Sequence, residues 1–149
     1  LVSGSESSSD YVVYLENVKI KPVVVSKSLK KTNEIKWTSF IKTLKNDDLA
    51  LTVKRLGVST NGILLVEFFI SSMKKINFRP EWLWLSQEGV NIPIHNLHLS
   101  NLSATPNQNI GGVILLRRED VDSKTPIRLE MRRTKVSYMT VSSVVSWKK

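Results

Sequence analysis

Residues 49–71 read LALTVKRLGVSTNGILLVEFFIS, and this stretch decides the fold. Apolar side chains recur at every second position from Leu49 to Val53, which is the period of a half-buried β-strand. Asn61 and Gly62 follow, and both tolerate a positive φ, so an Asn-Gly pair between two apolar runs predicts a β-hairpin. The predicted strands are residues 49–58 and residues 63–71.

The segments on either side of this hairpin carry similar strand-like patterns. In the run WLWL, Trp82 and Trp84 share one face and the leucines share the other, so a central strand or a partner surface is expected there. Short strands that recur about every 8–12 residues are typical of a β-sandwich or a barrel. Further predicted strands are residues 11–15 (YVVYL), 18–25 (VKIKPVVV), 110–117 (IGGVILLR), 127–132 (IRLEMR) and 136–147 (VSYMTVSSVVSW).

One segment changes period and predicts a short helix. In residues 34–45 (EIKWTSFIKTLK), the apolar residues fall at positions i, i+3, i+4 and i+7, which form one face of an α-helix. These residues are Trp37, Phe40, Ile41 and Leu44. We therefore predict a mainly β fold, an immunoglobulin-like β-sandwich of about eight strands with one short helix. The alternative is a Greek-key barrel of the OB type.

Length and composition indicate a single globular unit. The 149 residues match a common domain size, and we predict one β-sandwich domain over residues 11–149. It is preceded at residues 1–10 (LVSGSESSSD) by a flexible Ser-rich leader or linker. No cysteine is present, which excludes disulfides and thiolate metal sites. No apolar run approaches the roughly 18 residues of a membrane-spanning helix, so an integral membrane protein is not expected.

The chain is strongly basic. Lysine and arginine number 22 against 13 aspartate and glutamate, which gives a formal net charge of +9. Such a charge favours acidic partners, whether nucleic acid, anionic lipid or an acidic protein face, although it also keeps a domain soluble. The basic pairs, among them Arg117-Arg118 and Arg132-Arg133, lie far apart in the chain and form no basic tail.

Motifs that carry catalysis are absent from the sequence. It contains no Gly-x-Ser-x-Gly elbow, no P-loop and no Gly-x-Gly-x-x-Gly loop. His95 and His98 fall in a strand-like or irregular segment, where we expect two partly exposed side chains that point apart. Asp47-Asp48 lies beside lysine in a predicted loop, as solvated carboxylates do. We therefore predict no catalytic residues, no cofactor, no metal site and no enzymatic activity.

The order of features from Gly62 to Arg133 carries a resemblance. An apolar strand (ILLVEFFISS) leads into NFRPE and WLWL, and Gly111-Gly112 then introduces VILLRRED and TPIRLEMRR. This order resembles the immunoglobulin-like domains of bacterial envelope proteins, among them periplasmic components of conjugation and type IV secretion machines. Ser71-Ser72-Met73 stands where those domains often carry Asn-x-Ser, so no functional residues are carried over. The resemblance implies a periplasmic, outer-membrane-associated or extracellular location.

We therefore expect a non-catalytic structural domain that binds other protein subunits, either different proteins or copies of itself, in an exported envelope assembly. Exposed edge strands, here the strand around Pro22 and residues 136–147, take up partner strands in such assemblies. Tryptophan and arginine are favoured anchors at interfaces. The candidate interface residues are Trp82, Trp84, Trp147, Arg117, Arg118, Arg132 and Arg133.

Two other functions compete with this expectation. A basic nucleic-acid-binding β-barrel module would stack bases on aromatic residues such as Tyr138 and Phe78 inside a groove lined by arginines. A carbohydrate-binding module would stack sugars on coplanar tryptophan rings.

Overall fold

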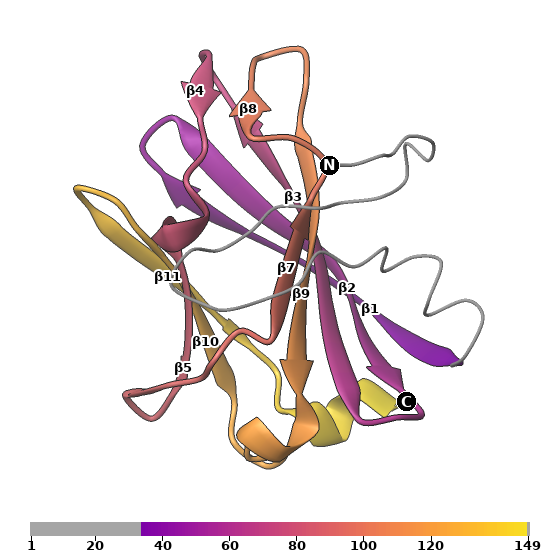
Figure 1. The fold of residues 1–149 in the computed structure, drawn as a ribbon. Helices are drawn as coiled ribbons and strands as arrows, with labels where there is room; N and C mark the ends of the chain where they lie inside the picture. The colour runs from indigo at the N-terminus through magenta and orange to yellow at the C-terminus, as the bar shows by residue number, and fades with distance from the viewer. Residues whose placement is uncertain (1–33, 149) are drawn as a thin grey trace.

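The computed structural model describes residues 34–148, and this part of the chain is mainly β. Two antiparallel sheets face each other across an apolar core (Figure 1). The prediction of a mainly β fold is confirmed, and the arrangement is consistent with a β-sandwich. The large sheet has the order β1 (Ile35–Asn46), β2 (Leu49–Ser59), β3 (Ile63–Ser72), β9 (Ile110–Arg117) and β7 (Asn96–Leu99). The small sheet has the order β11 (Val136–Val141), β10 (Ile127–Arg132), β5 (Leu83–Gln87) and β6 (Val90–Asn91).

Short elements connect these strands. The strands β4 (Ile76–Asn77) and β8 (Ser103–Ala104) pair with each other. The 3-10 helices are η1 (Pro80–Trp82), η2 (Arg118–Asp120) and η3 (Val144–Lys148). No helix in the region from residue 34 to residue 148 is long and apolar enough to cross a membrane.

The predicted hairpin at the start of the large sheet is confirmed. Strands β2 and β3 pair antiparallel, and Val58 lies opposite Leu64 next to the turn. Gly62 has a φ of 87°, which is the left-handed conformation that the Asn-Gly pair predicts. Strand β9 also forms over the predicted residues and pairs with β3, so both become interior strands of the large sheet.

The predicted helix at residues 34–45 is wrong, because this segment is the edge strand β1. The spacing i, i+4 is even, so two residues so spaced share a face of a strand as well as of a helix. Phe40 and Leu44 pack toward the core, whereas Trp37 packs on the outer face of the large sheet and Ile41 is exposed. The four apolar residues therefore belong to two opposite faces of one strand.

The carboxyl-terminal segment is only partly a strand. Strand β11 ends at Val141, and η3 then places Trp147 in the core, where its side chain is 0% exposed. Its ring Nε1 donates a hydrogen bond of 2.8 Å to the carbonyl of Ser142. The prediction that Trp147 is an interface residue is therefore wrong, because no surface of this side chain reaches solvent.

Strand β11 forms an edge of the small sheet, as expected, and this edge is tied to the large sheet. Lys42 Nζ, on β1, donates to the carbonyl of Thr140 at 3.2 Å, and the hydroxyl of Thr38 donates to the carbonyl of Trp147. The edge is therefore partly occupied by contacts within the chain. The predicted leader at residues 1–10 and the predicted Pro22 strand lie outside the described residues.

Candidate protein-interaction surface

A cross-strand row of side chains lies on the outer face of the small sheet. Glu130 of β10 pairs with Trp84 of β5 on one side and with Tyr138 of β11 on the other. The alternation along each strand sends the neighbours Leu129 and Met139 into the core, so the row faces away from the large sheet. An acidic residue thus stands between two aromatic rings.

Two arginines lie on either side of Glu130, and each forms an ion pair with its carboxylate. Arg128 and Arg132 precede and follow Glu130 by two positions on β10, which puts all three on one face. Arg128 Nε lies 2.9 Å from Glu130 Oε2, and Arg132 Nε lies 2.7 Å from Glu130 Oε1. Each oxygen of the carboxylate therefore contacts one guanidinium, and the Glu130 side chain is only 10% exposed.

Each guanidinium also lies over an aromatic ring. The guanidinium carbon of Arg128 is 3.6 Å from the centroid of the Tyr138 ring, and that of Arg132 is 4.2 Å from a Trp84 ring. Stacking of this kind contributes about 0.5–1 kcal/mol at an exposed site. We call these five residues the arginine–aromatic platform: Trp84, Arg128, Glu130, Arg132 and Tyr138.

The platform is ordered before any partner arrives. An arginine loses much rotamer freedom when it is fixed, and here the ion pairs and the rings already hold both side chains flat on the sheet. A guanidinium has five N–H donors, so one that uses Nε for Glu130 keeps other donors for a ligand. Tyr138 is 55% exposed, which leaves apolar ring surface for contact.

A second tryptophan and arginine pair lies at the end of the same strands. Arg133, the residue after β10, places its guanidinium 4.8 Å from a ring centroid of Trp82. Trp82 in turn meets the Phe78 ring edge-on, with centroids 5.4 Å apart. Phe78 is buried, so this pair anchors η1 to the core.

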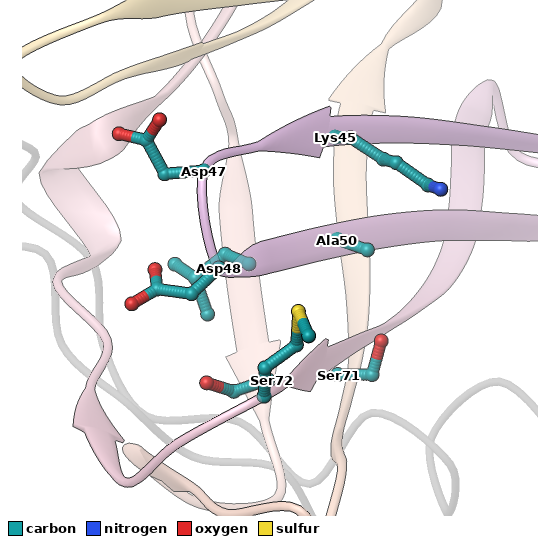
Figure 2. A pocket seen from close by; sticks show the side chains of 8 residues that line it. Lys45, Asp47, Asp48, Ala50, Ser71 and Ser72 are labelled. Atoms are coloured by element: carbon teal, nitrogen blue, oxygen red, sulfur yellow. The ribbon is translucent and has the colours of Figure 1, made fainter.

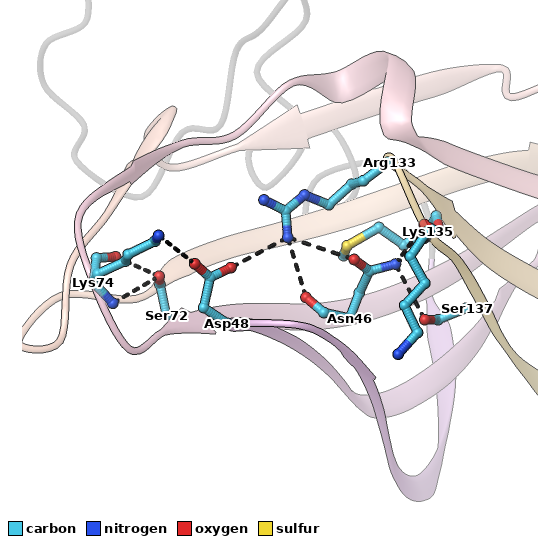
Figure 3. A network of polar contacts seen from close by, with 8 residues as sticks. Asn46, Asp48, Ser72, Lys74, Arg133, Lys135 and Ser137 are labelled. Carbon is cyan, nitrogen blue, oxygen red and sulfur yellow. Dashed lines mark hydrogen bonds and ion pairs between the residues drawn. The ribbon is translucent and has the colours of Figure 1, made fainter.

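Arg133 also bridges to the large sheet (Figure 3). Its Nη1 lies 3.1 Å from the carbonyl of Asn46 and 3.3 Å from Asp48 Oδ1. Lys74 Nζ lies 3.2 Å from the other carboxylate oxygen of Asp48. Burial alone raises the pKa of Asp48, but the hydrogen bonds from Lys74 and Arg133 outweigh it and leave that pKa below its ordinary value. This network joins the two sheets.

A shallow hollow beside this network is lined by residues of the β1–β2 turn and the end of β3. It has a volume of about 330 Å³ and lies along the β1–β2 turn, where Asp47 takes a φ of 57°. Figure 2 shows the carboxylates of Asp47 and Asp48 at the turn, with the Lys45 amine pointing away from both. Within residues 34–148, no three or more histidine, aspartate or glutamate side chains come together as metal ligands would.

The two histidines differ in their surroundings. His95 is exposed, as expected, whereas His98 is 2% exposed and lies opposite Val113 in the large sheet. The prediction of two partly exposed histidines is therefore wrong for His98, which lies beside Val113 on the face of the large sheet that points away from the core and is nevertheless buried there.

The structure brings together four of the seven predicted interface residues. Trp84 and Arg132 belong to the platform, and Trp82 and Arg133 form the neighbouring pair. Arg117 and Arg118 lie elsewhere, at the end of β9 and in η2, and Arg117 pairs there with Glu119 at 3.6 Å and Asp120 at 3.3 Å.

Sequence reasoning omitted Arg128 and Glu130 from the candidate site. The sequence did contain a pattern that could have indicated them. Apolar and charged residues alternate over residues 127–132, which predicted that Arg128, Glu130 and Arg132 face solvent. What the alternation does not show is the register that places Glu130 between two aromatic rings.

Comparison with known proteins gives little on function. No protein-family model and no curated protein matches the chain. One solved structure, a functionally unknown protein from Listeria monocytogenes EGD-e, is similar over 74% of this chain and 88% of its own, with a TM-score of 0.49 and 10% sequence identity.

Proposed function

We propose that this chain is a non-catalytic protein-interaction domain and that the arginine–aromatic platform binds an acidic surface of a partner protein. The observation that carries the proposal is the double restraint of Arg128 and Arg132, each paired with Glu130 and stacked on an aromatic ring. If these positions only had to face solvent, short polar side chains would serve there as well as arginine and aromatic residues do. Tryptophan, tyrosine and arginine side chains that contact one another at a surface are instead the composition of binding hot spots.

Preorganisation supports the same conclusion. Binding normally costs about 0.5–1.5 kcal/mol for each flexible side chain that becomes fixed. Arg128 and Arg132 are already fixed on the sheet, so a partner that contacts them avoids much of that cost. The arrangement therefore favours contact with a ligand over simple solvation of a charged face.

The positive charge of the platform indicates which kind of protein partner is complementary to it. The platform has two guanidinium groups against the single carboxylate of Glu130, and Lys42 and Arg133 add positive charge nearby. A second copy of the chain would bring the same positive face, and the net charge of +9 adds repulsion between copies. A partner with aspartate or glutamate around an apolar or aromatic centre is complementary.

The proposed setting is an exported bacterial envelope assembly, such as secretion or surface machinery. Support for this setting comes from the sequence order between Gly62 and Arg133, which resembles periplasmic immunoglobulin-like domains. In such an assembly the domain would act as a subunit that docks neighbours through a sheet face.

The test uses a random glutamate–tyrosine copolymer as the probe, added to the full isotope-labelled chain and followed by NMR. We expect chemical-shift changes centred on Trp84 and Tyr138 at about 50 mM salt, weaker at about 500 mM salt because exposed charges are then screened. Arg132→Gln should weaken Kd at least about fivefold, which is a typical loss at a hot spot.

Arg55→Gln is the matched control for this experiment. Arg55 also pairs with a carboxylate, Glu67, and lies 3.8 Å over a Trp37 ring, but it belongs to the large sheet. The proposal fails if both variants weaken binding equally, or if the copolymer leaves Trp84 and Tyr138 unmoved. If a mixed-sequence oligonucleotide binds the platform more tightly than the copolymer, the nucleic-acid-binding function replaces the proposed one.

A further inference from the structure

Strand β2 carries a β-bulge at Lys54. In its pairing with β3, Val53 lies opposite Phe68 and Arg55 lies opposite Glu67, which leaves Lys54 as an extra residue. A bulge interrupts the alternation of a strand and changes the direction in which its side chains point. Val53 is buried in the core, whereas Lys54 and Arg55 are both exposed. The bulge therefore places two consecutive cations on the outer face of the large sheet.

These two cations share one carboxylate. Arg55 Nε forms an ion pair with Glu67 Oε1, and the guanidinium lies 3.8 Å from a ring centroid of Trp37. Lys54 Nζ lies 4.0 Å from Glu67 Oε2, a long distance for an ion pair, and its side chain is 53% exposed. Glu67 neutralises one of the two positive charges. A single positive charge is therefore left over, and the Lys54 ammonium carries it.

A hollow lies beside these cations on the same face. It has a volume of about 520 Å³ and is bordered by the large apolar side chains of Trp37, Ile41 and Phe69. Ser39 of β1 and Thr52 of β2 also line it, and their short side chains leave space between the large ones. A mainly apolar lining with a few polar groups, at a volume of about 300–1,000 Å³, is typical of small-molecule sites.

Ile41 supplies exposed apolar surface at the edge of this hollow. The register of β1 against β2 shifts between Ser39 and Lys42, and within this irregularity Phe40 packs against the core while Ile41 is 78% exposed. A ligand that covers the Ile41 side chain removes apolar surface from water, which favours binding.

A pair of hydroxyls adds a hydrogen-bond donor. The Oγ1 atoms of Thr43 and Thr52 lie 2.9 Å apart, so one hydroxyl donates to the other and one proton stays free to donate elsewhere. Thr52 lines the hollow, as does Lys54. An anionic group bound there therefore meets a cation and a hydroxyl pair in the same lining.

We propose that this hollow binds a small amphiphile with one negative charge, of the class of medium-chain carboxylates. The apolar chain lies against Ile41 and Phe69, and the carboxylate pairs with the Lys54 ammonium. The single surplus positive charge favours a monoanion over a neutral or cationic amphiphile with the same chain. The inference is independent of the proposed function, because the arginine–aromatic platform lies on the small sheet.

The test uses decanoate as the probe, kept below the concentration at which it forms micelles and added to the full isotope-labelled chain. We expect NMR chemical-shift changes at the Ile41 methyl groups and the Phe69 ring, with Tyr138 of the platform unmoved. Decanol and decyltrimethylammonium carry the same chain with a neutral or a positive head group, so both should bind more weakly. Equal binding of the three probes, or no change at Ile41, overturns the proposal.

Two lysine variants test the position of the charge. Lys54→Gln should weaken the Kd for decanoate at least about threefold and leave that for decanol unchanged. Lys124→Gln removes the same charge from an exposed turn before β10 and should bind decanoate as the parent does. An equal effect of the two variants would mean that only net charge matters, which contradicts a site at Lys54.

Two apolar variants test the position of the chain. Ile41→Ser alters an exposed side chain, so the variant should fold, and it should weaken decanoate and decanol alike by at least about threefold. Val90→Ser is the matched control, since Val90 is 69% exposed but belongs to β6 of the small sheet. Decanoate binding that Ile41→Ser leaves intact overturns the proposal.

Vesicles of anionic phospholipid separate a small-molecule site from a membrane-docking face. The proposal requires free decanoate to bind in the absence of vesicles. If the chain binds the vesicles through Ile41 and does not bind free decanoate, the face docks on a lipid surface and the proposal is overturned.

Discussion

Arg133 and Asp48 join the two sheets at one end of the sandwich, although they lie 85 positions apart in the chain. Arg133 Nη1 is 3.3 Å from Asp48 Oδ1, and the two side chains are only 19% and 21% exposed. Each residue belongs to a turn: Asp48 joins β1 to β2, and Arg133 joins β10 to β11. The ion pair therefore connects two hairpins that share no strand.

This contact makes the stability of the domain dependent on acid pH. The pKa of Asp48 is lower in the folded chain than in the unfolded chain, where an aspartate titrates near about 3.9. The contribution of Asp48 is therefore fully present above about pH 4 and is lost as the pH falls through the lowered folded value. We expect Asp48→Asn to be less stable than the parent at pH 7 and to lose less stability below about pH 4.

Urea unfolding at a series of pH values measures this difference. Asp47→Asn removes the same charge from the same turn, at an exposed residue, and serves as the control. We expect its pH dependence to follow that of the parent. An Asp48→Asn variant whose stability falls with acid as steeply as that of the parent would show that the ion pair contributes nothing.

Truncation of the core residue Trp147 should mainly lower stability, whereas truncation of the platform residue Trp84 should mainly weaken binding. Trp147→Ala removes a fully buried ring and its hydrogen bond to Ser142, so we expect a loss of about 3–5 kcal/mol in unfolding free energy. Trp84→Ala removes a half-buried ring from the outer face and should cost about 1 kcal/mol or less. Copolymer binding should instead be weakened in Trp84→Ala and retained in folded Trp147→Ala.

Chemical unfolding and NMR titration of both variants check these outcomes. Loss of binding in both, or a stability loss of similar size in both, would contradict the division of the aromatic residues between core and surface.

The sequence-based predictions are accurate where residues close together in the sequence decide the structure, and they fail where pairing between distant segments decides it. The β2–β3 hairpin was predictable because Asn61 and Gly62 specify the turn locally. The strand at residues 35–46 was mistaken for a helix because apolar residues four positions apart share a face in both structures. Its identity is decided by pairing with β2, which a local pattern does not contain.

The candidate site shows the same limit. The alternation of Arg128, Glu130 and Arg132 with apolar residues predicted a wet face, and the structure confirms that strand. The register that sets Glu130 between Trp84 and Tyr138 depends on how β5, β10 and β11 align. The burial of Trp147 likewise depends on η3, where the chain leaves the strand that its apolar pattern had predicted.

Substitution of Asn46 should destabilise the fold, because its side chain on the large sheet hydrogen-bonds to the β10–β11 hairpin of the small sheet. Its Nδ2 donates to the carbonyls of Lys135 at 2.9 Å and Met131 at 3.3 Å, and to the hydroxyl of Ser137 at 3.1 Å. We expect Asn46→Ala to cost about 1–3 kcal/mol, because buried acceptors lose their donor. Asn46→Asp should be at least as harmful at pH 7, since a carboxylate donates no hydrogen bond. Equal stability of parent and alanine variant in urea unfolding would refute the role of this side chain.

Gly112 should tolerate no side chain, because its face of β9 is filled by two core residues. A Cβ there would lie 2.8 Å from Phe68 Cε1 and 2.9 Å from Leu99 Cδ2, both closer than real Cβ contacts allow. We expect Gly112→Ala to cost about 1–3 kcal/mol through overpacking. Phe68→Leu removes ring atoms from that space, so the double variant should lose less stability than the sum of the two single losses. Strict additivity of the unfolding free energies would show that the alanine methyl group is accommodated elsewhere and that Phe68 does not set the requirement for glycine.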